Sequence, residues 1–307
     1  MNKLKAFVYV YKNSLLSIGY YKDVLKTTLA FSLKYFFSLA VISSILITIS
    51  VSFNIYPELN RTMEEMLTKI KDVFPSELVI STKGNEWSIN LPEPLIIPFP
   101  EVESLEDMAQ APETPAAEIP ENLIVFDHNG TVEDFENLNT LILVNEKNVL
   151  VKQANKYDVY PIEELPDTQF DRSKFDSTVE SVRSFTKYLP YILAVFIFLG
   201  TLFYYLVLRT IYILMAAFIT WMGSFIFGSK LTYTQNMQVC LHAMTLPITI
   251  EVLINAVGFN MNLPFWFALV NIGFAMVVIM NLAKDEKAED RKEPKNLEDI
   301  NPPSNTA

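Results

Sequence analysis

The chain has 307 residues, half of them hydrophobic, and a formal net charge of −11 at pH 7. The apolar residues gather in long uncharged runs, which excludes an ordinary soluble globular protein, because a run of about 20 apolar residues suits a membrane-crossing helix. The acidic balance argues against nucleic acid as a partner, since phosphate binding needs concentrated Lys and Arg. A single cysteine excludes an internal disulfide.

Residues 1–34 carry six lysines against one aspartate, a net charge of +5. The lysines alternate with Tyr, Phe and Leu, which predicts a cytoplasmic segment lying at the membrane interface against anionic lipid. A cleaved signal peptide is the alternative. It fits poorly, because the basic region is too long and no small-residue cleavage site follows the apolar run.

The first predicted transmembrane helix covers residues 35–53, which contain no charged side chain. By the positive-inside rule, the lysines before it place the N-terminus in the cytoplasm. Residues 54–187, which contain 11 basic and 26 acidic side chains, are therefore expected outside the cell.

The pattern of residues 54–187 predicts a small α+β domain. Amphipathic helices are expected over 57–74 and 175–189, because their apolar residues fall on one helical stripe. Strands are expected over 77–82, 86–91, 123–126, 140–144 and 149–152, with a hairpin turn at Lys83-Gly84-Asn85. Residues 103–120, rich in Pro, Ala and Glu, are expected to form a flexible linker.

Four further spans are predicted in a membrane region covering residues 188–283, at 188–208, 210–228, 243–258 and 263–283. Only Arg209 separates the first two, which predicts a tight hairpin or a shared buried corner. The third is short and contains Pro247 and Glu251, so a re-entrant segment is the alternative. Five spans would place the charged tail, residues 284–307, outside the cell, and a re-entrant third segment would place it inside. The tail is expected to be disordered.

Several stretches together resemble the bacterial membrane family called domain of unknown function 1189. They are Ser14-Leu15-Leu16 to Tyr20-Tyr21, Pro75–Glu86, Leu123-Ile124-Val125-Phe126-Asp127, and Leu231-Thr232-Tyr233-Thr234-Gln235 leading to Ala243 and Pro247. The resemblance covers the chain to about residue 283 and implies a multi-pass protein of the bacterial plasma membrane. The last part also looks like the five-span Yip-type proteins, which implies membrane organisation or trafficking rather than chemistry.

One stretch, residues 123–132, resembles the first motif of haloacid-dehalogenase-like phosphatases, where Asp-x-Asp-Gly-Thr follows an apolar strand. There the first Asp attacks phosphorus and the second is the general acid. Here Asn129 follows Asp127 at the second position and has no carboxyl proton to donate. An Asn-Gly turn after a strand is the simpler interpretation. A calcium loop fits poorly, because Thr131 and Val132 stand where a ligand and Gly are required.

Glu251 is the acidic residue inside the predicted spans, and an ionisable group at that depth is a functional candidate. Asn255 lies one helical turn beyond it, and Arg209 is a candidate partner. The set of Glu251, Asn255 and Arg209 predicts either a proton-linked polar path or a structural bond between helices. Cys240 and His242 lie two residues apart, so they face different sides of a helix and form no metal site.

The sequence therefore predicts an α-helical membrane protein with about five transmembrane helices and an inserted α+β extracytoplasmic domain between spans 1 and 2. We expect no enzymatic activity, no catalytic or metal-binding residue and no cofactor. The expected partners are the lipid bilayer and other membrane or envelope proteins, in a scaffold, interaction or transporter-accessory role. A small-solute or proton-linked transporter using the Glu251 helix is the alternative, and an external phosphatase-like domain is a remote one.

Overall fold

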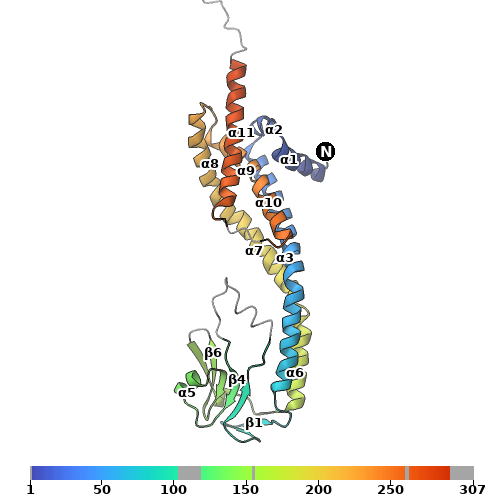
Figure 1. The fold of residues 1–307 in the computed structure, drawn as a ribbon, viewed down its shortest axis with the longest axis vertical. Helices are drawn as coiled ribbons and strands as arrows, with labels where there is room; N and C mark the ends of the chain where they lie inside the picture. The colour runs from blue at the N-terminus through green and yellow to red at the C-terminus, as the bar shows by residue number, and fades with distance from the viewer. Residues whose placement is uncertain (1, 103–118, 154–155, 260–262, 291–307) are drawn as a thin grey trace, which may run out of the picture. The chain divides into compact units, whose positions relative to one another are not determined.

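The computed structural model describes residues 2–102, 119–153, 156–259 and 263–290, and it divides the chain into two compact units (Figure 1). We call residues 1–54 with 193–307 the helical unit, and residues 55–192 the sheet unit. Most of the predicted linker and of the predicted tail lies outside the described residues.

The helical unit begins with two short helices that precede a long one, and a series of apolar helices completes it. Their bounds are α1 (Lys3–Leu16), α2 (Tyr20–Leu25), α3 (Leu29–Val73), α7 (Leu189–Phe203), the π-helical turn η2 (Tyr204–Leu208), α8 (Arg209–Ile226), α9 (Tyr233–Ala243), α10 (Thr245–Ala256) and α11 (Trp266–Asp290). The C-terminal part of α3, residues 55–73, and the first four residues of α7, 189–192, belong to the sheet unit. Residues 284–290, predicted as disordered tail, instead continue α11.

The described residues contain four helical runs that are long and apolar enough to cross a membrane, rather than the five predicted. They are Leu29–Val73, Leu189–Ile226, Tyr233–Ala256 and Trp266–Ala288. The difference arises at Arg209. Instead of a hairpin, α7, η2 and α8 follow one another without a break, because the charge of Arg209 is paired inside the unit and the helix does not need to end there.

Two other predicted boundaries were also wrong. The span expected at 243–258 belongs to a helical run that starts ten residues earlier, at Tyr233, where Thr232 and Gln235 form a reciprocal capping box. The predicted span 35–53 and the predicted helix 57–74 are parts of one helix, α3, which continues through Pro57. Proline costs this helix one backbone hydrogen bond, and the packing of α3 against α6 (Arg172–Thr186) compensates beyond it.

Small side chains let α8, α9 and α11 approach closely, as is usual between helices in lipid. Ala216 and Ala217 on α8 and Ala275 on α11 are fully buried in one cluster with Val239. A β-carbon built on Gly223 of α8 would lie only 2.4 Å from the Cε atom of Met276 on α11, so a larger residue there would displace the end of the Met276 side chain.

The N-terminal helices, the turn between α8 and α9, and the C-terminal end of α11 meet at one end of the helical unit. Lys22 forms an ion pair with Asp285 at 3.2 Å, and Lys230 forms one with Glu286 at 3.6 Å. The Nζ atom of Lys287 donates to the carbonyl oxygen of Phe227 at 3.0 Å. We call this the basic end of the helical unit.

The sheet unit contains two sheets and two long helical segments. The three-stranded sheet has the order β2-β1-β8, and the five-stranded sheet has the order β3-β4-β5-β6-β7. The bounds are β1 (Ile80–Lys83), β2 (Glu86–Ile89), β3 (Leu95–Pro98), β4 (Asn122–Phe126), α5 (Val132–Asn137), β5 (Thr140–Val144), β6 (Asn148–Gln153), β7 (Lys156–Pro161), the short 3₁₀ helix η1 (Ile162–Glu164), β8 (Thr168–Phe170) and α6.

The predicted hairpin is confirmed. Strands β1 and β2 pair in antiparallel register with Lys83 opposite Glu86, which leaves a two-residue turn. Gly84 takes a φ of +61°, a conformation that favours glycine at the first position of such a turn. Strands β4 and β5 pair in parallel, with α5 in the connection between them, and the other neighbours in both sheets pair in antiparallel fashion.

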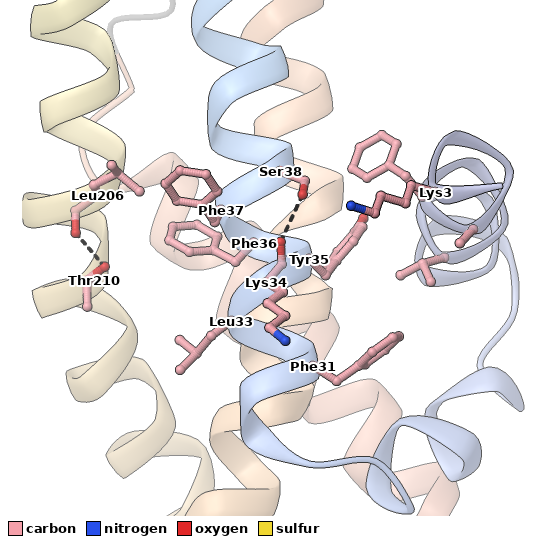
Figure 2. A pocket seen from close by; sticks show the side chains of 13 residues that line it. Lys3, Phe31, Leu33, Lys34, Tyr35, Phe36, Phe37, Ser38, Leu206 and Thr210 are labelled. Atoms are coloured by element: carbon pink, nitrogen blue, oxygen red, sulfur yellow. Dashed lines mark hydrogen bonds between the residues drawn. The ribbon is translucent and has the colours of Figure 1, made fainter.

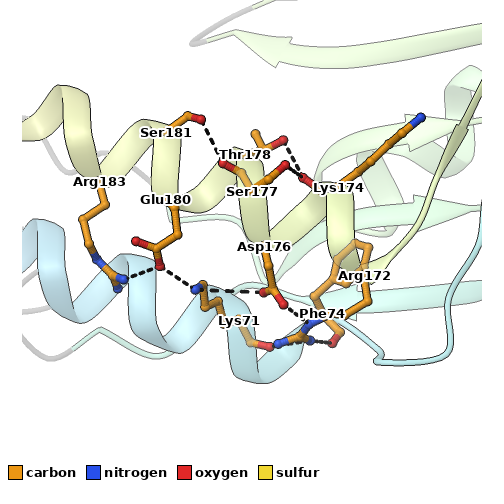
Figure 3. Close-up of polar contacts among 10 residues, drawn as sticks. All are labelled: Lys71, Phe74, Arg172, Lys174, Asp176, Ser177, Thr178, Glu180, Ser181 and Arg183. Atoms are coloured by element: carbon orange, nitrogen blue, oxygen red, sulfur yellow. Dashed lines mark hydrogen bonds and ion pairs between the residues drawn. The ribbon is translucent and has the colours of Figure 1, made fainter.

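The end of α3 and helix α6 lie side by side and exchange charged side chains (Figure 3). Lys71 bonds to Glu180 at 2.8 Å, and Arg183 bonds to Glu64 at 3.1 Å. Arg172 donates to the carbonyl oxygens of Lys71 and Phe74, which lie at the C-terminal end of α3. These contacts fasten the two helices while the apolar sides pack toward the sheets, where Phe74 stacks on Phe175.

Candidate functional site

The structure brings two of the three predicted site residues together inside the helical unit. An Nη atom of Arg209, at the start of α8, lies 3.2 Å from an Oε atom of Glu251 on α10. The hydroxyl of Tyr205, in η2, donates to the second carboxylate oxygen of Glu251 at 3.0 Å. The side chains of Arg209 and Glu251 are only 10% and 19% exposed, so the pair is largely removed from solvent. We call Tyr205, Arg209 and Glu251 the Arg–Glu cluster.

Aromatic rings surround the guanidinium of Arg209. Its central carbon lies 3.2 Å from the ring centroid of Phe267 on α11 and 4.8 Å from that of Tyr204. A cation over an aromatic face is attracted by the ring quadrupole, more strongly where water is excluded. The Nε atom of Arg209 is buried and has no hydrogen-bond partner among the described residues. The cation is therefore stabilised by one carboxylate and two rings.

Tyr205 and Arg209 are four residues apart, a spacing at which side chains of one helix share a face. The π-helical turn Tyr204–Leu208 contains Tyr205 and directly precedes Arg209. Tyr205 is fully buried. π-turns often occur at functional sites, and here both side chains reach the carboxylate of Glu251.

Asn255, the third predicted residue, does not bond to the carboxylate. Its side-chain nitrogen donates to the backbone carbonyl of Glu251 at 2.8 Å, and its own backbone carbonyl accepts from Ser50 of α3 at 2.7 Å. Asn255 therefore stabilises the end of α10 and its contact with α3 rather than the charge of Glu251.

A second polar cluster, which the sequence did not indicate, surrounds His242 on α9. The imidazole is fully buried, with Nδ1 at 3.1 Å from the Ser14 hydroxyl of α1 and Nε2 at 3.2 Å from the Ser32 hydroxyl of α3. Its ring stacks on Tyr35 with a centroid distance of 4.8 Å and an angle of 7°. The hydroxyl of Tyr35 lies 2.8 Å from that of Thr245. We call these residues the His242 cluster.

Helix α1 supplies one member of this cluster, Ser14, so the segment predicted to lie against lipid also packs on the long apolar helices. The hydroxyl of Tyr21, on α2, donates to the backbone carbonyl of Ser14 at 2.9 Å. Burial raises the pKa of Tyr20 to about 12, so its phenol stays neutral. Leu4, Val8 and Leu16 of α1 remain exposed, which leaves an apolar face for the interface.

Cys240 and His242 face different sides of α9, as their spacing predicted. The thiol of Cys240 lies 3.3 Å from the hydroxyl of Thr220, whereas His242 contacts Ser14 and Ser32. The described residues contain no group of three or more His, Cys, Asp or Glu side chains suited to hold a metal ion.

The phosphatase-like stretch forms the turn that the simpler interpretation predicted. Strand β4 ends at Phe126, and the amide of Gly130 donates to the carbonyl of Asp127 at 3.0 Å. Asp134, in the first turn of α5, accepts from the hydroxyl and amide of Thr131. These bonds, led by the one from the hydroxyl, lower the pKa of Asp134. A general acid needs the opposite shift.

His128 in this turn belongs to a separate contact. Its Nδ1 atom lies 2.7 Å from a carboxylate oxygen of Glu93, and its ring stacks on Trp87 with a centroid distance of 4.1 Å. The indole nitrogen of Trp87 donates to the carbonyl of Asn145 at 2.6 Å. This arrangement fixes the turn to the edge of β2.

Comparison with protein families gives one match, to a family described as protein of unknown function (DUF1189), over residues 106–282. The match covers more than half of the chain. The chain belongs to the DUF1189 family. No curated protein and no solved structure matches it. The resemblance to Yip-type proteins stays a prediction.

The region shared with the DUF1189 family contains the whole Arg–Glu cluster and also His242. It leaves out Ser14 and Ser32, which bond to the two ring nitrogens of His242, and Ser50, which bonds to the end of α10. In this DUF1189 chain, each of these polar contacts therefore joins a residue of α1 or α3, outside the matched region, to a residue inside it.

Proposed function

We propose that the chain is a multi-pass protein of the bacterial plasma membrane that holds its acidic sheet unit outside the cell as an interaction module. In this role it is a scaffold or an accessory to a transporter. The observation that carries the proposal is the closed state of the Arg–Glu cluster. Both carboxylate oxygens of Glu251 are occupied by Arg209 and Tyr205, which suits a bond that fastens helices together.

Two features of the helical unit support this orientation. The described residues contain four candidate spans, an even number that would bring residues 1–28 and the end of α11 to the same side, and the contacts Lys22–Asp285 and Lys230–Glu286 agree with that arrangement. The basic end carries the lysines of residues 1–34, whereas residues 257–265 at the α10–α11 connection contain no charged side chain. The positive-inside rule assigns the basic end to the cytoplasm.

Cysteine labelling with a membrane-impermeant maleimide tests the orientation, in a Cys240→Ser background. Asn85→Cys, in the exposed β1–β2 turn, should label in intact cells. Ala288→Cys, exposed near the end of α11, should label only after permeabilisation. Labelling of Ala288→Cys in intact cells would contradict the four-span arrangement and restore the five-span prediction.

A pull-down in mild detergent tests the interaction role. Replacing residues 78–169 by a short Gly-Ser linker removes both sheets. It keeps α3 and α6 and the polar contacts between these two helices. Envelope or transporter proteins that co-purify with the full chain should be lost with this variant. Unchanged co-purification would assign any partner to the helical unit and contradict an interaction role for the sheet unit.

A transporter that uses the Glu251 helix is the second candidate, and one observation favours it. The hydroxyl oxygens of Ser44, Thr48 and Ser52 lie one turn apart along α3, are buried, and have no hydrogen-bond partner among the described residues. Buried hydroxyls normally find partners, so such a line suits water or a small polar solute.

Variants of the Arg–Glu cluster separate the two roles when folded yield and a growth or uptake phenotype are both measured. Glu251→Leu leaves the Arg209 cation uncompensated, which typically costs about 3–5 kcal/mol for a buried pair, and should lower the yield. Replacing both partners, as Arg209→Met with Glu251→Leu, should restore it. A fastening role predicts a normal phenotype for the double variant. A transporter role predicts that the double variant and Glu251→Gln both give a normal folded yield but lose the growth or uptake phenotype.

We also infer that the sheet unit has no phosphatase activity, because Asn129 stands where the phosphatase motif has its general acid. Residues 55–192, purified with Mg²⁺, should show no turnover of a phosphomonoester. Hydrolysis that Asp127→Asn abolishes would contradict this.

A further inference from the structure

An apolar groove of about 840 Å³ lies in the helical unit beside the first turns of α3. Helix α1 lines it with Phe7 and Val10, α3 with Leu33 and Phe37, and η2 with Leu206 (Figure 2). Leu33 and Phe37 are 43% and 54% exposed. The groove is therefore open to the surroundings of the helical unit, and an apolar chain fits it better than water.

Two lysines provide the charge of this groove. Lys3 extends from α1 and Lys34 from α3, and both line the groove (Figure 2). Neither ammonium group has a hydrogen bond or an ion pair within the part of the chain that the structure describes. Two other lysines at the basic end are engaged, Lys26 with Asp23 and Lys287 with a backbone carbonyl.

The hydroxyl groups that line the groove are already used. The hydroxyl of Ser38 donates to the carbonyl of Lys34 at 3.0 Å, and that of Thr210 donates to the carbonyl of Leu206 at 2.7 Å. Polar recognition of a ligand thus falls to the two ammonium groups. A matching ligand carries negative charge at one end and a long apolar part at the other.

The groove lies near the N-terminal end of the first candidate span, where the headgroup of such a ligand is expected. Lys34 lies five residues after the start of α3, next to the N-terminal helices of the basic end. Lysine side chains near a helix end extend their ammonium toward the headgroup region while their stems stay in apolar surroundings. Basic pockets between transmembrane helices on this side of a membrane bind anionic lipid headgroups.

We propose that this groove binds an anionic phospholipid. Its phosphate lies between the ammonium groups of Lys3 and Lys34, and one acyl chain lies along Phe7, Leu33 and Phe37. A zwitterionic lipid fits less well, because the choline cation would meet two lysines. The lipid would hold α1 against α3 without adding a protein contact. This goes beyond the scaffold role and rests on the proposed function only for the orientation of the basic end.

Native mass spectrometry of the full-length protein in a non-ionic detergent tests the proposal, with phosphatidylglycerol and phosphatidylcholine as probes. The wild type should bind phosphatidylglycerol more tightly. The double variant Lys3→Gln/Lys34→Gln should lower that affinity about thirtyfold, since each lysine near an anionic lipid contributes roughly a fivefold change. Both side chains are exposed, so folding should not change, and gel filtration checks this.

The matched control is Lys5→Gln/Lys12→Gln, which removes the same charge from exposed positions of α1 outside the groove. Its affinity should stay within about twofold of the wild type. Equal loss in both double variants would reduce the effect to general surface charge and overturn the site. Equal binding of the two lipids would also overturn it. So would a disulfide-linked dimer of Ser38→Cys/Cys240→Ser in native membranes, because a second copy would then occupy the groove.

Discussion

The helical unit and the sheet unit of this chain are held together by different interactions. The helical unit buries hydroxyl, imidazole, amide and guanidinium groups that bond between helices, as at Ser14–His242, Tyr35–Thr245 and Arg209–Glu251. The sheet unit buries apolar side chains between its sheets and helices, and its ion pairs lie on the surface, as at Lys71–Glu180.

The surroundings of each unit explain this difference. In water, burial of apolar surface drives folding. In lipid, an apolar side chain gains little by leaving the hydrocarbon for another helix, so close packing of small residues and polar bonds between helices determine the structure. The units should therefore respond differently to the same kind of substitution.

The largest effect is expected from removing core volume in the sheet unit. Leu143 of β5 is fully buried together with Val125, Phe135 and Leu150. Leu143→Ala should destabilise the sheet unit by about 2–5 kcal/mol, measured by pulse proteolysis of the full-length protein across a urea series. The control is Val159→Ala on β7. Val159 is 48% exposed, so this variant should change the stability of the sheet unit little. Equal shifts of the urea midpoint in the two variants would show that the apolar core does not dominate the stability of the sheet unit.

A smaller but still large effect is expected at His242. His242→Leu fills a similar volume and leaves the hydroxyls of Ser14 and Ser32 without their partner, which costs about 1–3 kcal/mol. Folded yield in detergent should fall. Adding Ser14→Ala and Ser32→Ala should recover most of it, because the two hydroxyls that bonded to His242 are then also absent and none of the three groups is left without its partner. A triple variant that is worse than the single one would contradict this explanation.

A single hydroxyl should matter less. Tyr35→Phe removes only the group that bonds to Thr245 and keeps the stacked ring on His242. Bonds between transmembrane helices average about 0.6 kcal/mol, so the midpoint of thermal unfolding in detergent should fall by a few degrees at most. Tyr9→Phe, on the exposed side of α1, is the matched control. A loss as large as that of His242→Leu would mean that Thr245 has a further role.

The smallest effect concerns the surface ion pairs of the sheet unit. The hydrogen bond from Lys71, together with the nearby charge of Arg183, lowers the pKa of Glu180. A lowered carboxyl pKa stabilises the folded state above the ordinary value of 4.5, and this stabilisation is lost as the pH falls through the lower folded value. Because the pair is exposed, the loss should be small. When the urea midpoint of unfolding is plotted against pH, its fall at acidic pH should be less steep in Glu180→Gln. An unchanged fall would exclude this ion pair as its cause.

Local patterns predicted the sheet unit well where they carried turn or strand chemistry. The Gly84 turn and the apolar run of β5 were located from sequence, because both signals lie within a few residues. Strand β7 was missed, since its residues are exposed on both sides and do not alternate. The pattern of β8 covers only three residues, too few to be distinguished from a loop.

The helical unit was less predictable because its decisive contacts join distant residues. Glu251 and Arg209 could be paired as candidates, since charges in a span are rare and seek each other. His242 could not be linked to Ser14, which lies 228 positions away and has no distinctive neighbours. Separate helices were predicted over 35–53 and 57–74, whereas α3 continues through Pro57, a residue that usually interrupts a helix. The contacts of α3 with α6 beyond Pro57 join residues that are far apart in the sequence.

The stacking of Trp87 on His128 gives the sheet unit an optical signal of its own. The chain has three tryptophans, and the other two, Trp221 and Trp266, belong to helices of the helical unit. After Trp221→Phe and Trp266→Phe, emission would come from Trp87 alone, whose ring stacks on that of His128 at a centroid distance of 4.1 Å. The chain thus contains a natural reporter through which unfolding of the sheet unit can be followed while the helical unit remains silent.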